Sequence, residues 1–160
     1  MSSEGNAQSV LMVCLGNICR SPIAAHVFKH LAKEKGVESQ WLCDSAGTGG
    51  WHVGEDMDPR SASTLRKHKI EPVHTVRQIT KADFKKFDFI FGMDNENIRD
   101  LKQKAPSGSK AQIELLSSYD PEGAKIIRDP YYDRDLSGFE DCYQIAYRSC
   151  SAFLDKFSKK

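Results

Sequence analysis

Short apolar runs of strand length recur along the chain, separated by longer segments whose apolar residues are spaced as on one face of a helix. The apolar runs predict four buried strands, at Ser9–Val13, Trp41–Asp44, Phe87–Met93 and Ala111–Leu116. The amphipathic segments predict helices from Pro22 to Gly36, from Pro59 to His68, for one turn at Thr80–Asp83, from Asp94 to Lys104 and from Ser137 to Phe157.

Polar residues before these helices predict where each one starts. Ser21, followed by proline, is the predicted N-cap of the first helix, and Asp58 and Asp94 are predicted to cap two later ones. The segment Ser137–Glu140 has the spacing of a capping box and is expected to begin the last helix.

The alternation of strands and helices predicts a single α/β domain over residues 9–158, built on a four-stranded parallel sheet with helices on both faces. Residues 1–8 are expected to be a flexible N-terminal segment. Ligands of such sheets bind beyond the carboxyl ends of the strands, so the loops after Val13, Asp44, Met93 and Leu116 are where a site is expected.

Charge and composition narrow the partners and the compartment. The 160 residues include 23 basic and 22 acidic side chains, which leaves no basic surface of the kind that binds nucleic acid or a membrane. No apolar run reaches the roughly 18 residues of a transmembrane helix, and the first eight residues do not resemble a signal peptide. We therefore expect a cytoplasmic protein without membrane insertion.

Five cysteines, an odd number, favour free thiols in a reducing compartment over a disulfide framework. Cys43, Cys142 and Cys150 lie in apolar surroundings along the sequence, and we interpret them as small packing residues. Cys14 and Cys19 occupy a different setting, the turn-rich segment between the first strand and the first helix.

That segment, Cys14–Ser21, has the residue types of an anion-binding loop with a nucleophile. It leads into a helix N-terminus, whose free amides favour an anion and the thiolate form of Cys14. Gly16 and Asn17 tolerate the positive φ angles that turn successive N–H groups inward. Arg20 supplies a planar fork for two phosphate oxygens, which a lysine could not reproduce. The pattern predicts phosphoryl-transfer chemistry.

Four motifs together resemble the low-molecular-weight protein tyrosine phosphatases, which are also known as acid phosphatases. The motifs are V-C-L-G-N-I-C-R-S-P at Val13–Pro22, D-S-A-G at Asp44–Gly47, M-D at Met93-Asp94 and D-P-Y-Y at Asp129–Tyr132. The resemblance spans roughly Val10 to Leu154. It implies a flavodoxin-like or Rossmann-like fold and hydrolysis of phosphotyrosine and aryl phosphates without metal or cofactor.

The resemblance also implies catalytic roles. Cys14 would form a cysteinyl-phosphate, and Arg20 and the loop amides would hold the phosphate oxygens. The general acid would be Asp129, although sequence chemistry alone leaves three other carboxylates of the same long loop open, those of Asp120, Asp133 and Asp135. Asp133 stands where many relatives have glycine, and its effect on the acid or on the loop is left open.

Further positions follow from the same motifs. The residues expected to bind the substrate phosphate or ring are Leu15, Gly16, Asn17, Ile18, Cys19, Ser21, Trp51, Tyr131 and Tyr132. Asn17, Ser45 and His74 would brace the loop through hydrogen bonds. For Asp94 we favour a helix cap over a contact with Arg20, and for Ser21 a cap over a hydrogen bond to the thiolate.

Two forms of regulation are implied as well. Oxidised Cys14 could be trapped by Cys19 as a disulfide, with simple packing of Cys19 as the equal alternative. Tyr131 and Tyr132 are potential targets of a tyrosine kinase, as in relatives.

Four competing interpretations were weighed. His26 and His30 on the first helix resemble a zinc site only faintly, and a solvated helix face explains both. An arsenate reductase would need further cysteines, and residues 81–92 contain none. A binding module without activity would not need Cys14 and Arg20 intact. A phosphoarginine phosphatase would resemble relatives that carry threonine in place of Ile18.

Overall fold

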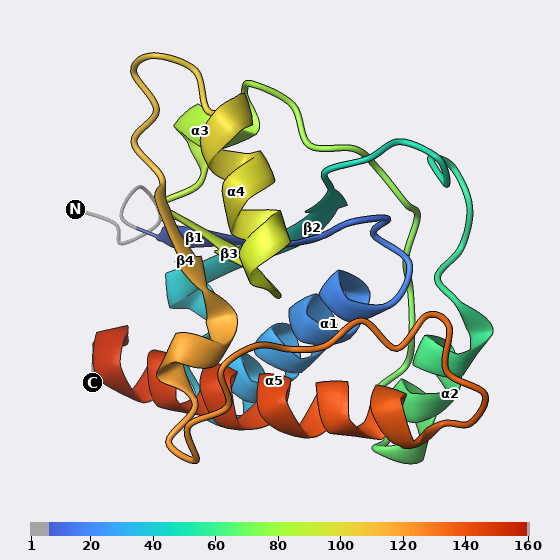
Figure 1. The fold of residues 1–160 in the computed structure, drawn as a ribbon. Helices are drawn as coiled ribbons and strands as arrows, with labels where there is room; N and C mark the ends of the chain where they lie inside the picture. Colours follow the sequence, from blue (N-terminus) through green and yellow to red (C-terminus); the bar gives the residue numbers. More distant parts are fainter. Residues whose placement is uncertain (1–6, 160) are drawn as a thin grey trace.

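A computed structural model describes residues 7–159 of the chain. Four strands and five helices follow one another along it (Figure 1): β1 (Gln8–Cys14), α1 (Arg20–Glu34), β2 (Trp41–Gly47), α2 (Pro59–Lys67), α3 (Asp83–Lys86), β3 (Phe89–Gly92), α4 (Asn95–Lys104), β4 (Gln112–Leu115) and α5 (Ser137–Phe157). Short 3-10 turns, η2 (Glu38–Gln40) and η3 (Leu116–Tyr119), complete the list. Of the N-terminal segment expected to be flexible, residues 1–6 lie outside the described residues and Gln8 already belongs to β1.

The four strands form one parallel sheet in the order β2-β1-β3-β4, which confirms the predicted fold class. The chain leaves β1 toward β2 on one side and later returns to β3 on the other. The strand order therefore reverses beside β1, and a crevice opens at the carboxyl ends of β1 and β3, the place where open α/β sheets bind ligands.

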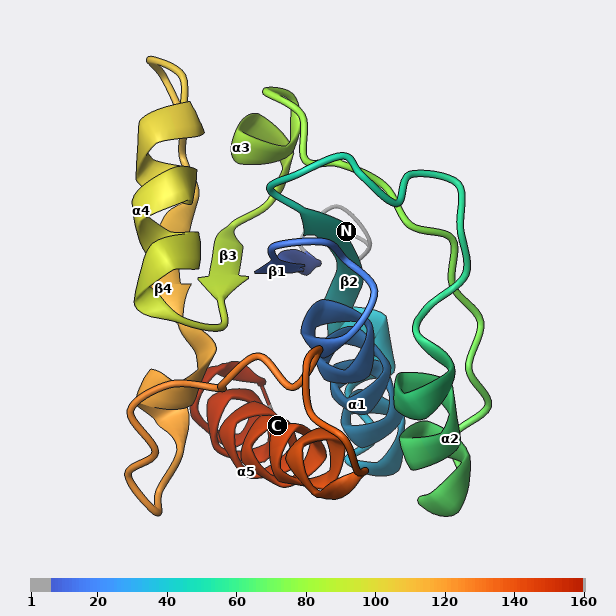
Figure 2. The ribbon, with the colours of Figure 1, turned by 45° about the vertical axis from the view of Figure 1, so that its right-hand side comes forward.

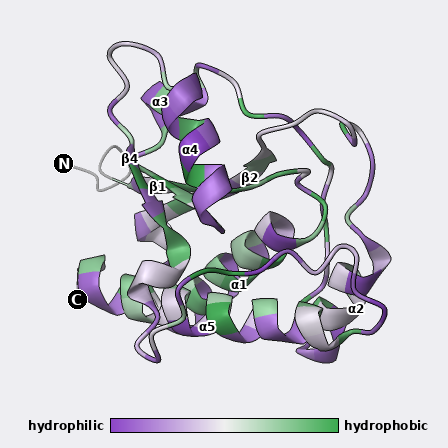
Figure 3. Ribbon diagram, in the orientation of Figure 1, coloured by the Kyte–Doolittle hydropathy of each residue, from purple (hydrophilic) through white to green (hydrophobic). Residues whose placement is uncertain are grey.

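Helices cover both faces of this sheet, because alternate side chains of its buried strands point to opposite sides. Val10 and Met12 of β1 share a hydrophobic cluster with α1 and α5, and Leu11 and Val13 share a second cluster with α3 and α4. Figure 2 shows α1 and α5 on one side of the sheet and α3 and α4 on the other. Hydrophobic residues are concentrated on the central strands and on parts of α1 and α5 (Figure 3).

The strand β2 is longer than predicted. The residues after Asp44, expected to form a turn, extend the strand as far as Gly47, which pairs with Cys14 in register. The small residues Ser45, Ala46 and Gly47 lack the apolar pattern that predicts a strand. The pairing comes from β1 and from Ile79, whose N–H donates to the Gly47 carbonyl oxygen.

Two of the predicted caps are confirmed and two are wrong. Asp58 accepts a hydrogen bond from Arg60 N at 2.8 Å, and Asp94 accepts one from Asn97 N at 2.8 Å. Ser21 is not an N-cap, because α1 begins at Arg20 and the Ser21 hydroxyl faces the loop instead. The helix α5 has no side-chain cap from Ser137, so the predicted capping box does not form.

Within residues 7–159, none of the helices combines the length and the apolar character needed to cross a membrane.

Candidate active site

The loop after β1 and the segment before α5 enclose a cavity of about 300 Å³. It is lined by Cys14, Leu15, Gly16, Ile18, Cys19, Arg20, Trp51, His52, Asp129, Tyr131 and Tyr132. The cavity lies where β1 ends and α1 begins, so the strand and the helix N-terminus both point into it (Figure 1). All of these residues except His52 were expected at the site.

Asn17 fixes the shape of the loop Cys14–Ser21. Its φ of 60° is in the left-handed region, as predicted, and its side-chain amide donates to Ser21 Oγ at 2.8 Å and to Ser45 Oγ at 3.0 Å. The amide oxygen accepts from Arg77 N at 3.0 Å. These contacts tie the loop to α1, to β2 and to the segment before α3.

Gly16 was expected to share the positive φ, and it does not. It instead gives space: a Cβ atom at this position would lie 3.3 Å from the His52 ring. The ring of His52, from the neighbouring loop, therefore lies close to the backbone of Gly16.

His74 supports the loop from outside. Its Nε2 atom lies 2.8 Å from the carbonyl oxygen of Asn17, which can only accept, so Nε2 carries the proton. Burial lowers the pKa of His74, although the hydrogen bond to Asn17 opposes this, and the ring is neutral at pH 7.

The sulfur of Cys14 faces two donors from the first turn of α1. It lies 3.0 Å from Ser21 Oγ and 3.5 Å from Ser21 N. Because Asn17 donates to the same hydroxyl oxygen, that hydroxyl is free to donate its proton to the sulfur. These donors stabilise negative charge on Cys14, as does the N-terminus of a helix. Of the two alternatives for Ser21, the contact with sulfur is the one present.

Arg20 is buried, and two acceptors from other parts of the chain hold its guanidinium. Its Nη1 atom donates to Asp94 Oδ2 at 2.7 Å and to the Ile127 carbonyl oxygen at 3.0 Å. Asp94 thus caps α4 and also orients Arg20, where we expected the cap alone. Burial opposes the charge, but Cys14 and the hydrogen bond to Asp94 outweigh it and raise the pKa of Arg20.

Among the four candidate carboxylates, Asp129 is the one that lines the cavity with Cys14 and Arg20. Its Oδ2 atom lies 3.7 Å from Arg20 Nη2, and its Oδ1 atom accepts from Tyr131 N at 3.1 Å. The other three have partners elsewhere: Asp120 binds Arg148, Asp133 binds Arg128, and Asp135 binds Ser137.

Comparison with known proteins identifies this arrangement. Residues 9–160 match the family model of the low molecular weight phosphotyrosine protein phosphatases. The pig (Sus scrofa) member is 51% identical over 96% of this chain and 98% of its own. The chain belongs to this family. It is a cysteine-dependent protein tyrosine phosphatase, a hydrolase of phosphoric monoesters, and its substrates are phosphotyrosine-containing proteins.

Solved structures agree with the fold of this phosphatase. The crystal structure of Primo-1 is similar with a TM-score of 0.91 and 47% identity, covering 94% of this chain and 99% of that one. The structure of DARP, a drosophila arginine phosphatase, is similar with a TM-score of 0.89 and 37% identity, covering 94% and 98%. The scaffold is therefore shared by proteins described as acting on different phosphorylated residues.

Aromatic and aliphatic side chains form the mouth of the phosphatase cavity. Trp51 and Tyr132 are strongly exposed, at 69% and 89%, and Leu15 is partly exposed. The ring of Tyr131 meets that of Tyr132 edge to face, with centroids 4.8 Å apart, and Ile18 is nearly buried below them. A flat, apolar group can therefore be accepted between these side chains.

The second thiol of the loop differs from the first. Burial, together with the nearby Asp58 and Cys14, raises the pKa of Cys19 far above its usual value. Cys19 is therefore a protonated thiol at neutral pH. Burial also raises the pKa of Cys43 and of Cys142 to about 12, and all five cysteines are free.

Of the two histidines of α1, His26 differs from the expected solvated helix face, and His30 agrees with it. His26 is not simply solvated: Nδ1 donates to the Pro22 carbonyl oxygen at 2.6 Å, and Nε2 accepts from Val73 N at 3.0 Å. His30 pairs with Glu34 at 3.2 Å. Residues 7–159 contain no group of three or more side chains arranged to hold a metal ion.

Sequence reasoning missed several residues that shape the phosphatase site. Arg77 donates to Asn17, and Arg60 donates to the carbonyl oxygens of Tyr131 and Asp133, both at 2.9 Å. Gly47 lies so close to the loop that a Cβ atom there would be 2.9 Å from the Leu15 carbonyl oxygen. For Gly47 a signal existed, the D-S-A-G motif, but arginines far away in sequence gave none.

Proposed function

We propose that this phosphatase hydrolyses phosphotyrosine and other aryl phosphate monoesters through a cysteinyl-phosphate on Cys14, with Asp129 as the general acid. It needs neither a metal ion nor another cofactor. The observation that carries the proposal is that one cavity joins the Cys14 sulfur, the Arg20 guanidinium and the Asp129 carboxyl.

In the first step, the Cys14 sulfur attacks phosphorus. The S–P bond forms as the bond from phosphorus to the phenolic oxygen breaks, and Asp129 gives that oxygen its proton. Arg20 binds two phosphate oxygens with N–H groups not used by Asp94 and Ile127, and loop amides of Gly16, Asn17, Ile18 and Cys19 hold the developing charge.

In the second step, water attacks the phosphorus of the cysteinyl-phosphate. Asp129, now a carboxylate, takes the proton from that water, and the S–P bond breaks. The hydroxyl of Ser21, 3.0 Å from the sulfur, stabilises the departing thiolate.

The shape of the mouth favours phosphotyrosine over phosphoserine. Trp51, Tyr131 and Tyr132 surround a path wide enough for a ring, and a shorter side chain would leave its phosphate short of Cys14. The similarity to an arginine phosphatase supports one second candidate, phosphoarginine. Ile18, which lines the cavity, favours the aromatic substrate, because relatives that act on phosphoarginine carry threonine in its place. A direct comparison of kcat/KM for the two phosphorylated peptides decides between them.

The mechanism is tested with phosphotyrosine peptide and aryl phosphate in the presence of EDTA. We expect Cys14→Ser to be inactive and Asp129→Ala to lose about 10²- to 10⁴-fold, the usual contribution of a general acid. Asp120→Asn is the matched control, because this carboxylate also precedes a proline but binds Arg148 instead. Activity in Cys14→Ser would refute the mechanism, and a larger loss in Asp120→Asn than in Asp129→Ala would reassign the acid.

We further propose two ways in which this activity is regulated and the cellular compartment in which the protein acts. Peroxide would oxidise Cys14 to a sulfenic acid, and the thiol of Cys19 would displace water to form a reversible disulfide. If thiol restores the oxidised Cys19→Ser enzyme as fully as the wild type, the proposed protection by Cys19 is wrong.

A tyrosine kinase would modify Tyr131 or Tyr132, of which Tyr132 is the more exposed, and mapping the modified residue by mass spectrometry tests this proposal. The free thiols support a reducing compartment such as the cytoplasm, which microscopy of the tagged protein would check.

A further inference from the structure

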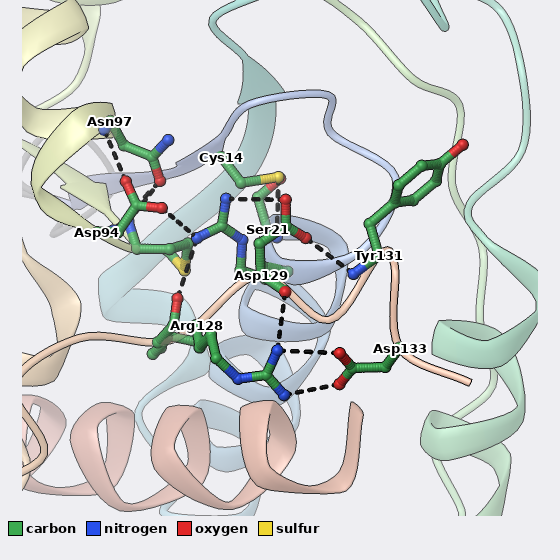
Figure 4. Close-up of polar contacts among 11 residues, drawn as sticks. Cys14, Ser21, Asp94, Asn97, Arg128, Asp129, Tyr131 and Asp133 are labelled. Carbon is green, nitrogen blue, oxygen red and sulfur yellow. Dashed lines mark hydrogen bonds and ion pairs between the residues drawn. The ribbon is translucent and has the colours of Figure 1, made fainter. Parts of the chain in front are cut away.

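An ion pair closes the segment that carries Asp129. Arg128 Nη2 lies 2.6 Å from Asp133 Oδ2, and Arg128 Nη1 donates to Asp133 Oδ1 at 3.0 Å. The same Nη1 atom donates to the carbonyl oxygen of Asp129 at 3.2 Å. Figure 4 shows the guanidinium of Arg128 lying between the main chain of Asp129 and the carboxylate of Asp133. The residues on either side of the general acid and its tyrosines are therefore joined directly.

The enclosed segment is held at its centre as well. Asp133 N donates to the Pro130 carbonyl oxygen at 2.9 Å, which makes a turn, and Tyr131 N donates to Asp129 Oδ1 at 3.1 Å. Arg60 on α2 reaches the carbonyl oxygens of Tyr131 and Asp133. These contacts fix the turn. Of the side chains that hold this segment, Arg128 is the one that contacts the main chain of Asp129 itself.

Gly138 in the first turn of α5 leaves room for this ion pair. A Cβ atom at position 138 would collide with the carboxylate of Asp133 and would lie 2.8 Å from Arg128 Nη2. The ion pair thus rests on the bare backbone of α5. Arg128 and Asp133 are therefore complementary in charge, and Gly138 is complementary to both in shape.

We propose that Arg128, Asp133 and Gly138 form a clamp that positions the carboxyl of Asp129 over the departing oxygen of the substrate. The clamp rests on the proposed role of Asp129 as general acid. Arg128 and Asp133 are positioning residues, because neither lines the cavity in which the phosphate is transferred.

The geometry shows why Asp129 needs such support. Its side chain reaches Arg20 only at 3.7 Å, longer than a hydrogen bond, and otherwise accepts from the neighbouring Tyr131. It lies in a stretch between η3 and α5 that has no helix or strand of its own. A carboxyl on such a stretch keeps its place only if the main chain does, and a small displacement of a catalytic group lowers the rate.

An exposed ion pair contributes little to stability, so the expected effect is modest. If the whole of it orders the acid, its loss lowers the rate of acid-assisted bond breaking about fivefold. A leaving group that departs without a proton hardly depends on the acid. Comparing two leaving groups therefore separates a displaced acid from a general loss of structure.

The experiment measures kcat/KM for phenyl phosphate, which needs the acid, and for 2,4-dinitrophenyl phosphate, which does not. The variants are Arg128→Gln, Asp133→Asn and Gly138→Ala. We expect each to lower kcat/KM for phenyl phosphate about three- to fivefold while the dinitrophenyl ester changes less than about twofold. Inhibition by inorganic phosphate should be unchanged, because the loop that binds it is not altered.

Gly138→Ala is the most informative variant. It removes no charge, its backbone angles suit alanine, and alanine is the better helix former. It displaces the ion pair by occupying its space, and the added Cβ atom would also lie 3.0 Å from Pro130 Cβ. Asp155→Asn is the matched control, since it breaks another exposed ion pair of α5, with Lys35 at 2.9 Å. It should leave the ratio of the two rates as it is in the wild type.

Asp129→Ala separates the two proposals. If it lowers both esters equally, Asp129 is not the general acid and the proposed function fails there. If it selectively loses phenyl phosphate while the three clamp variants keep the wild-type ratio, only the clamp is refuted. Opposite changes in Arg128→Gln and Asp133→Asn would also refute the clamp, because charge effects on Asp129 would then replace positioning.

Discussion

The loop Cys14–Ser21, proposed to hold the phosphate, depends on one residue for its backbone shape. Asn17 adopts a φ of 60°, which costs an ordinary L-residue roughly 1–2 kcal/mol, and it makes three side-chain hydrogen bonds from there. Glycine would keep the backbone angle and lose the bonds. Alanine would lose the bonds and also carry the strain. The two effects can therefore be separated at a single position.

We expect Asn17→Ala to lower the free energy of unfolding by more than Asn17→Gly does, with a difference of about 1 kcal/mol. Both variants should lose activity, because the Ser21 hydroxyl loses the donor that orients it toward Cys14. Urea unfolding followed by tryptophan fluorescence measures the first effect and phenyl phosphate hydrolysis the second. Equal stabilities of the two variants would show that the positive φ costs nothing here.

Residue types along the sequence predicted this site better than they predicted each residue's contacts. The spacing from Cys14 to Arg20, together with the strand before it, Gly16-Asn17 within it and the helix start after it, was sufficient to propose the nucleophile and the anion site, because both lie on one short loop. Ser21 was misassigned as a cap, since capping rules assume that the first amides of a helix need a side-chain acceptor. Here the Ser21 amide faces the sulfur of Cys14, which takes the place of a side-chain cap.

At the scale of elements, β2 and the phosphate loop are packed against each other through a glycine. Gly47 ends β2 beside Cys14, and a Cβ atom there would lie 2.9 Å from the Leu15 carbonyl oxygen and 3.1 Å from Asn17 N. Both atoms belong to the main chain of the loop, so neither can turn aside as a side chain could. The end of one strand thus limits where the loop amides lie.

Gly47→Ala should therefore move the loop amides and lower kcat/KM at least tenfold, with weaker inhibition by inorganic phosphate. Gly50→Ala is the control. A Cβ atom there would meet only the end of the Gln78 side chain, at 2.7 Å, which can move away. Steady-state kinetics with phosphate as inhibitor check both. Wild-type phosphate binding in Gly47→Ala would show that the loop tolerates the displacement.

The elements themselves were predictable to different degrees. All four strands could be located from short apolar runs, although only β1 and β3 are largely buried, and the parallel sheet follows from the alternation of strands with helices. The bounds of α5, Ser137–Phe157, agree with the prediction, but its capping box does not form, because other partners take both side chains. Glu140, expected in a capping box, instead lies 2.9 Å from His68, while the Ser137 hydroxyl binds Asp135 at 2.7 Å.

At the scale of the whole molecule, two half-buried histidines connect the helical layer to the loops around the site. His26 on α1 accepts a hydrogen bond from the main-chain N–H of Val73. His74, the next residue, donates from its ring to the carbonyl oxygen of Asn17 in the loop Cys14–Ser21. Burial lowers the pKa of both histidines, and for each of them this is the largest cause. The folded protein thus holds both rings neutral where the unfolded chain would protonate them.

Stability should therefore fall as the solution becomes acidic. Unfolded histidine has a pKa of about 6.5, so above that pH neither state binds the proton and the full stability is present. As the pH falls below about 6.5, the unfolded chain binds protons that the folded protein does not, and the free energy of unfolding decreases. We expect a lower urea midpoint at pH 5.5 than at pH 7.5.

A glutamine at position 26 tests the origin of this change. It offers a donor and an acceptor but does not titrate, so His26→Gln should show a smaller difference between the two midpoints than the wild type. His30→Gln is the control, because His30 lies on the same helix beside Glu34 at its surface, and it should keep the wild-type difference. The carboxylates of Asp58, Asp83 and Asp120 do not interfere, since their lowered pKa values place their loss of stability below about pH 4. A midpoint in the wild type that does not change with pH would contradict the neutral, half-buried state of these histidines.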